Sequence, residues 1–393
     1  MLVMTLELSK LAGQVRAMGQ ELAARERQNA DLAELARRIL AQYADQGGQL
    51  RHAAQAVHSA IPTGDPFDAA HALPALPERF TVIAADGSQI QPDRHGVALF
   101  YLINVGSLVY RHGSGEAPVA RSEPTIGYSE ADVYENGRLV AGNLLDVRRA
   151  LAEITCLADL CAAEAAGPTV ALVDGTLLLW VLEERAEEWQ RARVMAYLDQ
   201  LRRIREAGAA VAAFVSRPRH TEVARLAHLA SLEGDAKRAT QEPNPLEYLP
   251  DRAIFETLPP GARSALFASP SPINHDAYEA AGHGIRFCYL NLVAEGRGRG
   301  GNHIARVELP AWVAATPDLL ALAHAAIVAQ ARITGDYPYA LVRADELAYV
   351  SAQEHQAFEQ MVATALLRAG FQPALSPKAY YKTLTRGGRR KYR

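Results

Sequence analysis

The chain has 393 residues, of which 49% are hydrophobic and 22% charged, and its formal net charge is −3. This composition is typical of a globular protein with an ordinary core, and the length predicts one large domain with an appendage or two modest domains. The charge excludes a polycationic binding protein, although a local basic groove is compatible with it. The three cysteines have neither metal-finger spacing nor a secreted disulfide pattern, and no targeting segment or membrane span is evident. A cytoplasmic location is therefore expected.

The N-terminal region predicts a helical arm. Residues 6–46 are rich in Ala, Leu, Glu, Gln and Arg, with apolar residues at helical spacing. One or two amphipathic helices are expected, either packed on their own domain or free to contact a second copy or a partner. Four prolines then indicate a linker. We divide the chain into an N-terminal helical arm (1–60), a Pro-rich linker (61–78) and a main domain (79–393) with a basic C-terminal tail.

Strand and helix patterns alternate after the linker. Apolar, β-rich runs predict strands at 80–85, 97–110, 125–134, 169–173, 209–215, 285–293 and 304–309. Helical spacing predicts helices at 146–166, 177–207, 222–232, 319–334 and 354–370, and an irregular segment is expected at 233–272. This order predicts an α/β fold, a mixed sheet flanked by helices that is compatible with a ribonuclease-H-like core. In that plan the first and fourth strands are neighbours.

Two of the predicted strands lead into an aspartate followed by a glycine. Asp86 follows the strand at 80–85, and Asp174 follows the strand at 169–173. Neighbouring strands would aim both carboxylates from one rigid edge, and carboxylate oxygens are the ligands that Mg²⁺ and Mn²⁺ prefer. The simpler interpretation is that each Asp-Gly pair is only a turn. The placement of the two pairs after apolar strands favours a metal site suited to phosphoryl chemistry.

Two further residues extend this candidate site. Glu153 lies close to the apolar face of the predicted helix at 146–166, where a carboxylate would need a partner or a metal; a solvated glutamate is the alternative. Tyr337 precedes a proline that stiffens an extended segment. Its ring could stack on a base and its hydroxyl hold a phosphate, or it could simply pack in a core.

Arginines and lysines supply candidates for contacts with a phosphate backbone. A Gly-Arg loop at 296–301 and a terminal basic run with interleaved tyrosines suit such contacts. A solvated tail is the alternative for the terminal run. The predicted nucleic-acid-binding residues are Arg149, Arg217, Arg219, Arg297, Arg299, Lys382, Arg386, Arg389 and Arg390.

Several short peptides, taken in order, resemble those of the NurA nucleases, and together they span about residues 80 to 350. The matching pieces are Asp86-Gly87-Ser88, the helix from Arg149 to Glu153, Leu172-Val173-Asp174-Gly175-Thr176, Ser216-Arg217-Pro218-Arg219, and Tyr337-Pro338-Tyr339-Ala340-Leu341 followed by Ala344-Asp345. The resemblance implies a ribonuclease-H-like fold and a metal-dependent deoxyribonuclease with 5′-to-3′ exonuclease and single-strand endonuclease activity. It also implies one or two bound Mn²⁺ ions, with Mg²⁺ as an alternative.

The resemblance further implies partners and residue roles. The expected partners are DNA, a second copy of the chain and a hexameric HerA-type translocase, acting together in DNA end resection, with no membrane involved. Catalytic and metal-binding roles fall on Asp86, Glu153 and Asp174, and a catalytic role falls on Tyr337. Where archaeal members have a histidine this chain has Asp345. An aspartate can hold a metal but cannot serve as a neutral imidazole base, and we include Asp345 in both sets.

Two other functions stay open. The departure at Asp345 is compatible with a catalytically weak DNA-end-binding adaptor that regulates a translocase. Asp-Gly turns also occur in phosphotransferases of the sugar-kinase class, although the glycine-rich adenosine-site pattern of that class is missing here. The sequence contains no Walker A loop, Gly-x-Ser-x-Gly elbow or His-Glu-x-x-His helix. Any ATP-driven motor is therefore expected to be a partner.

Overall fold

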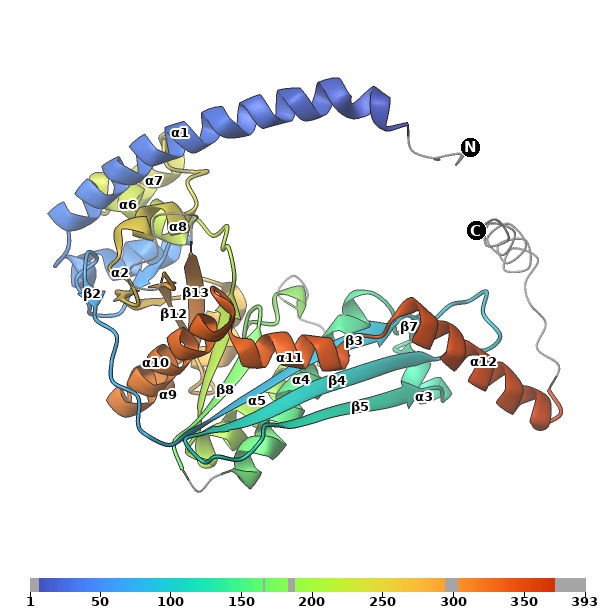
Figure 1. Ribbon diagram of the computed structural model, residues 1–393. Coiled ribbons are helices and arrows are strands. Elements are labelled where there is room, and N and C mark those ends of the chain that lie inside the picture. Colours follow the sequence, from blue (N-terminus) through green and yellow to red (C-terminus); the bar gives the residue numbers. More distant parts are fainter. Residues whose placement is uncertain (1–6, 165–166, 183–187, 294–302, 372–393) are drawn as a thin grey trace. The chain divides into compact units, whose positions relative to one another are not determined.

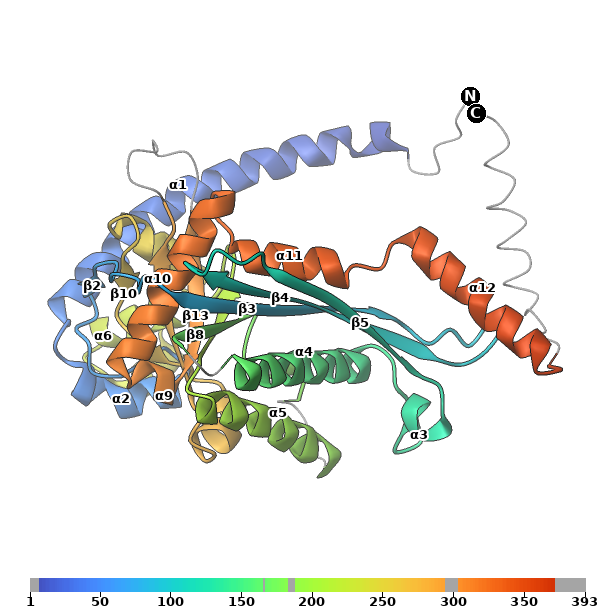
Figure 2. The ribbon, with the colours of Figure 1, turned by 60° about the horizontal axis from the view of Figure 1, so that its bottom comes forward.

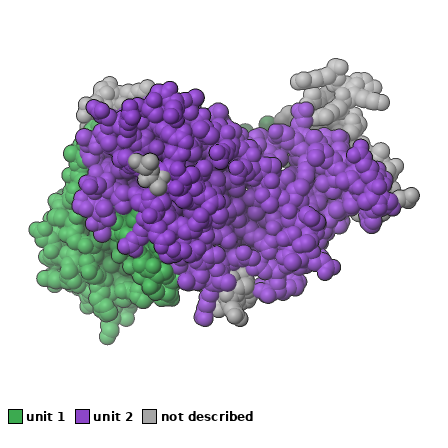
Figure 3. Space-filling view, turned by 90° about the horizontal axis from the view of Figure 1, so that it is seen from below, with its two compact units in different colours: residues 1–73, 214–314 green, residues 74–213, 315–393 purple. Residues whose placement is uncertain are grey.

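The computed structural model describes residues 7–164, 167–182, 188–293 and 303–371 (Figure 1). The chain forms two compact units, one of residues 1–73 with 214–314 and the other of residues 74–213 with 315–393 (Figure 3). The three-part division that composition suggests stays a prediction, and the compact units divide the chain at other positions. No described helix is both long and apolar enough to cross a membrane.

The unit of residues 1–73 and 214–314 packs helices against short strands. Its helices and helical turns are η1 (Leu8–Leu11), α1 (Ala12–Gln42), α2 (Gly47–Ala56), α6 (Glu222–Ser231), α7 (Ala236–Gln241), α8 (Asp251–Ile254), η3 (Phe255–Thr257), η4 (Asn274–Glu279) and α9 (Ala311–Ala314). Its strands are β1 (Ile61–Pro62), β2 (Ala70–His71), β10 (Arg263–Ser264), β11 (Phe267–Ala268), β12 (Ile285–Asn291) and β13 (Ile304–Pro310). The strands β1, β11, β12 and β13 pair antiparallel in that order. The short strands β1 and β2 both lie within the Pro-rich segment at 61–78.

The predicted N-terminal helix is present as α1, and its two halves differ in burial. Ala33, Ala36 and Leu40 of α1 are buried in a core shared with α6 and α8. Apolar residues of the first half, such as Val15 and Leu22, are more than half exposed. The C-terminal half of α1 therefore packs on its own unit, as the simpler interpretation expected.

The other unit is built on a mixed sheet whose described strands lie in the order β5-β4-β3-β8-β9. The strands are β3 (Phe80–Ile90), β4 (Tyr101–His112), β5 (Val119–Gly127), β8 (Thr169–Asp174) and β9 (Ala210–Val215). β3 is antiparallel to β4 and β4 to β5, whereas β3 is parallel to β8. The predicted neighbourhood of the first and fourth strands is confirmed, and the fold is ribonuclease-H-like.

Helices cover both faces of this sheet (Figure 2). α4 (Asn143–Ala163) contacts β3 on one face and packs on α5 (Glu188–Glu206), because α4 presents a continuous apolar stripe of buried residues. α11 (Tyr339–Ala348) lies against β3 and β4 on the other face and contacts α10 (Pro317–Thr334). The remaining elements are α3 (Glu130–Val133), the β6–β7 hairpin (Tyr134–Glu135 and Arg138–Leu139), η2 (Trp180–Leu182) and α12 (Ala352–Arg368).

β5 is an edge strand of this unit. Seven consecutive residues of β5 are exposed, and Pro124 is paired with Asn104 of β4. The strand predicted at 125–134 begins too late, since the observed strand is β5, Val119–Gly127. An exposed strand needs few apolar residues, so the apolar pattern does not mark its start. Its second half is instead the short helix α3, which begins at Ser129 with a capping box.

Three other predictions need correction. The Asp86-Gly87 pair is not a turn, because both residues lie inside β3. The helix predicted at 177–207 begins only at α5, after the short turn η2. The stretch after Pro338, predicted as extended, is the helix α11. Pro338 is its N-cap and is itself extended, with φ −60° and ψ 121°, and the helix begins at the next residue.

A glycine allows α11 to lie directly on the sheet. In the β3–β4 register Gly106 is opposite Asp86. A Cβ atom at position 106 would collide with backbone atoms of Ala344, Leu347 and Ala348. Since these atoms cannot rotate away, the close approach of α11 to β4 depends on the missing side chain.

We expect Gly106→Ala to destabilise the fold by about 1–3 kcal/mol, because a side chain forced into a packed contact displaces the helix. Urea denaturation measures the change. Gly167→Ala is the control, since a Cβ there meets no atom within 4 Å. It should change stability by less than about 0.5 kcal/mol. Equal stability of the two variants would contradict the role given to Gly106.

Candidate active site

Asp86 and Asp174 lie side by side on parallel strands. Ala85 is paired with Val173, so each aspartate is the next residue along its strand. The Asp86 carboxylate accepts a hydrogen bond of 2.8 Å from the backbone N–H of Gly87. Asp174 is the exposed last residue of β8 and is followed by Gly175, whose φ of +87° ends the strand in a true turn. The two aspartates therefore lie on neighbouring strands, as expected; their role in a metal site stays a prediction.

Glu153 approaches this edge from α4. Its carboxylate accepts a 2.6 Å hydrogen bond from Arg149, and the same guanidinium nitrogen donates to the backbone oxygen of Gly87 at 3.1 Å. A Cβ on residue 87 would lie 2.5 Å from Oε1 of Glu153. A side chain at position 87 would therefore displace the side chains of Glu153 and Arg149 from their present positions.

Tyr337 and Asp345 approach from the α11 side. The Tyr337 hydroxyl donates a 2.5 Å hydrogen bond to the Asp174 carboxylate. Because opposite residues of an antiparallel pair project to the same face, Asp86 and Gly106 both face α11. Asp345 lies on that helix and is exposed. The site thus combines carboxylates that reach it from both faces of the sheet.

Sequence reasoning missed the polar residues that fix α11 in place. The Asn104 side chain and the Ser88 hydroxyl both donate to the carbonyl oxygen of Ala348, at 2.8 and 2.5 Å. At the other end, the buried Gln330 accepts a 2.8 Å hydrogen bond from the backbone N–H of Ala340. Of these residues, only Ser88 lies in a peptide that resembles the NurA nucleases, Asp86-Gly87-Ser88. Its position two residues after Asp86 was the only sequence feature that indicated a place near the site.

The carboxylates strongly influence one another. Burial raises the pKa of Asp86 to about 6, and the charges of Asp174 and Asp345 also raise it, against the Gly87 hydrogen bond and Arg149. Burial raises the pKa of Glu153 to about 8, with Asp86 and Asp174 adding to the effect and Arg149 opposing it. Burial and the hydrogen bond to Asp174 hold the pKa of Tyr337 well above its usual value, so its phenol is a neutral donor. The charge of Asp174 raises the pKa of all three groups, and Asp345 raises that of Asp86 and Tyr337, so these side chains are close enough to form one acidic unit.

The kind of donor in this unit fits a hard divalent cation. Asp86, Glu153, Asp174 and Asp345 offer only carboxylate oxygens, and like charges held near one another in a partly buried site favour a cation between them. Their arrangement is less closed than a finished metal site. Within the described residues, no group of three or more His, Cys, Asp or Glu side chains is arranged so that it could hold a metal ion.

The structure describes some of the predicted nucleic-acid-binding residues and not others. Arg149 lies inside the site through its bonds to Glu153 and Gly87. Arg217 and Arg219 are exposed on the loop after β9 and belong to the other compact unit. The remaining predictions lie outside the described residues; they are Arg297, Arg299, Lys382, Arg386, Arg389 and Arg390.

The fold and the site together define a ribonuclease-H-like protein with an acidic centre on two adjacent parallel strands. A family model of the NurA domain matches residues 80–350, which is more than half of the chain. The chain therefore belongs to the NurA family, as its short peptides predicted.

Comparison with solved structures gives further similar proteins. The NurA nuclease from Sulfolobus solfataricus is 15% identical, with a TM-score of 0.46 and coverage of 90% of this chain and 98% of that one. A structure of NurA with manganese is 11% identical, with a TM-score of 0.38 and coverage of 75% and 91%. A structure of NurA bound to dAMP and manganese is 13% identical, with a TM-score of 0.31 and coverage of 75% and 90%. No curated protein matches the chain.

The raised pKa of Glu153 predicts a pH-dependent stability. A carboxyl group whose pKa rises from 4.5 to about 8 on folding binds its proton more tightly when folded. The folded state therefore loses stability as the pH rises through that range. In EDTA, Glu153→Gln should gain about 1–3 kcal/mol relative to wild type between pH 5 and pH 9, because glutamine does not titrate. Urea denaturation at several pH values measures this.

The control for this experiment is Glu206→Gln, whose side chain is 61% exposed. Its stability relative to wild type should not change with pH. A stability difference between Glu153→Gln and wild type that is the same at pH 5 and pH 9 would contradict the buried, charge-coupled position of Glu153.

Proposed function

We propose that this protein is a divalent-metal-dependent deoxyribonuclease. The main support is the placement of Asp86 and Asp174 on adjacent parallel strands, where Asp174 and Asp345 raise the pKa of Asp86 and both strand aspartates raise the pKa of Glu153. Membership of the NurA family supports the same activity. Two of the similar solved structures contain manganese, one of them with dAMP, and Mn²⁺ is therefore the cation we propose.

The proposed roles follow from the contacts of each residue. Asp86, Glu153, Asp174 and Asp345 would hold the cation, which supplies positive charge for a phosphodiester that gains negative charge during cleavage. Tyr337 orients the Asp174 carboxylate through its hydrogen bond and keeps its own proton. Arg149 carries a positive charge beside Glu153, where it can attract a phosphate of the bound strand.

We further propose the finer activity that the family resemblance implies. The enzyme would degrade DNA 5′ to 3′, cut single strands internally, and act as a homodimer with a HerA-type translocase in end resection. The missing Walker A loop supports a separate motor partner. Arg217, Arg219 and the basic residues of the C-terminal stretch would contribute to DNA binding.

Removing either strand aspartate should abolish the activity. With labelled single-stranded DNA and Mn²⁺, we expect Asp86→Asn and Asp174→Asn each to lower the rate of degradation at least about 100-fold, because an amide cannot replace a carboxylate at the cation. Asp199→Asn, on a half-exposed side chain of α5, is the control and should keep wild-type activity. EDTA should stop degradation by the wild type.

Two results would overturn this proposal in different ways. Equal activity in all three variants would mean that the cleavage comes from another protein in the preparation. Salt-sensitive DNA binding by the wild type without cleavage in Mn²⁺ or Mg²⁺ would instead identify the DNA-end-binding adaptor. The aspartate at position 345, where archaeal members have a histidine, is the sequence feature that favours this second function.

The hydrogen bond between Tyr337 and Asp174 has its own test. Tyr337→Phe keeps the ring and removes the donor, so the Asp174 carboxylate loses its orientation. We expect kcat to fall about 10-fold with little change in KM for DNA, because the bond positions a catalytic group and does not bind the strand. Tyr349→Phe, on a 67% exposed ring, is the control. An unchanged kcat in Tyr337→Phe would remove Tyr337 from the site.

A further inference from the structure

A cavity of about 270 Å³ opens beside the two carboxylates of Glu153 and Asp174. It lies between α4, the end of β8, the turn that follows β8, and α5. Its walls away from the carboxylates are apolar and aromatic and include Leu178, Leu179, Trp180 and Tyr197. None of the roles assigned above uses this space. A largely apolar hollow next to an acidic centre indicates a binding site for part of a substrate.

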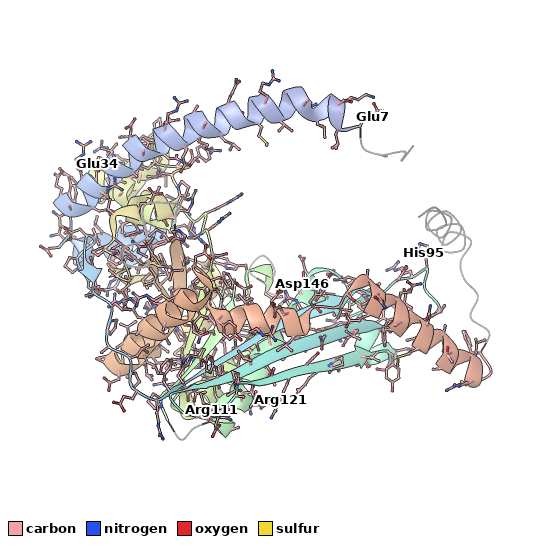
Figure 4. The ribbon with its side chains drawn as sticks, viewed as in Figure 1. Glu7, Glu34, His95, Arg111, Arg121 and Asp146 are labelled. Carbon is pink, nitrogen blue, oxygen red and sulfur yellow. The ribbon has the colours of Figure 1, made fainter. Side chains whose placement is uncertain are left out.

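The charges around the cavity favour a neutral ligand. Three carboxylates line it, those of Asp146, Glu153 and Asp174, against one guanidinium, that of Arg149 (Asp146 is labelled in Figure 4). Arg149 is already paired with Glu153. A phosphate inside the cavity would face Asp146 and Asp174 with only the paired Arg149 to offset them, whereas a nucleobase is uncharged and most nucleobases carry amino groups that can donate to these oxygens.

Trp180 gives the cavity a fixed aromatic wall. Its indole N–H donates a 3.2 Å hydrogen bond to the Thr176 hydroxyl, which also accepts from the backbone N–H of Leu178. The turn after Asp174 therefore holds the ring in one orientation. Trp180 is half-buried, so part of its surface remains accessible from the cavity. An aromatic ring held in place is the usual platform for stacking an unpaired base.

We propose that this cavity receives one unpaired nucleobase of a DNA strand, stacked on Trp180, while the adjoining phosphodiester lies at Asp86 and Asp174. The volume is near the lower limit of small-molecule pockets, about 300 Å³, and is suited to a single base and not to a base pair. The choice of DNA as the ligand rests on the proposed function. The cavity then adds a requirement that the strand be single-stranded at the site.

Fluorescence of 2-aminopurine tests the stacking directly. An oligothymidine carries this base at its 5′ or 3′ terminal nucleotide, and a distant dye reports binding by anisotropy. In EDTA, so that no cleavage occurs, binding to the full-length wild type should quench the terminal base. Trp180→Ala should remove most of the quenching, whereas Trp180→Phe, which keeps an aromatic face, should retain it. Tyr128→Ala, on a 75% exposed ring, is the control.

A second variant guards against misfolding of Trp180→Ala. Ala150 also lines the cavity and is partly exposed, so Ala150→Trp should fill the space without emptying the core. It should abolish quenching as Trp180→Ala does. Thermal unfolding shows whether each variant is folded. Equal quenching in wild type, Trp180→Ala and Ala150→Trp would overturn the proposal, as would bound DNA with no quenching in the wild type.

An abasic terminal nucleotide provides the matching test in the substrate. Wild type should bind this DNA about 10-fold more weakly than normal DNA, and Trp180→Ala should bind both equally. A wild type that does not distinguish them would overturn the inference. Neither binding assay requires cleavage, so they separate two failures. Trp180-dependent quenching without Mn²⁺-dependent degradation would support the nucleobase site and contradict the nuclease activity. Degradation without such quenching would support the nuclease activity and contradict the nucleobase site.

Discussion

Two glycines, Gly87 and Gly106, lie where the helices α4 and α11 closely approach the central strands β3 and β4. Glu153 and Arg149 of α4 lie against Gly87 on one face of β3, and the backbone of α11 lies against Gly106 on the other face of the sheet. Gly106 is paired with Asp86, the residue immediately before Gly87. Both close contacts therefore occur at the level of one aspartate, and the remaining side chains of the site depend on them for their positions.

The same closeness has an energetic cost. Burial and neighbouring negative charges make the ionised forms of Asp86 and Glu153 less favourable here than in water. Arg149 offsets part of this cost at Glu153, and the hydrogen bond from Gly87 offsets part of it at Asp86. The stability of the sheet elsewhere, where residues 80–85 of β3 and 169–173 of β8 are largely apolar and buried, is what permits this arrangement. Such unfavourable local charge is characteristic of functional sites.

Sequence patterns predicted the sheet well because buried strands such as β8 are continuous apolar runs with an abrupt polar end. They also singled out Asp86, Asp174 and Glu153, since carboxylates beside apolar runs are conspicuous, and the structure brings these three side chains near one another. They failed at α11, whose ten residues follow a proline and carry only four buried positions. The contacts of Gly106, Asn104 and Ser88 could not be read from the sequence, because each depends on a helix more than 200 residues away.

The exposed strand β5 has a consequence for the solution behaviour of the protein. An uncovered strand edge can recruit strands from other molecules and so begin aggregation. Here Pro124 interrupts the row of backbone N–H donors, and Arg121 and Glu123 place charges beside it. A foreign strand that tried to extend the sheet would lose a hydrogen bond and bring its own backbone next to two charged side chains. Pro124 and the two charged side chains therefore disfavour the addition of a further strand at this edge.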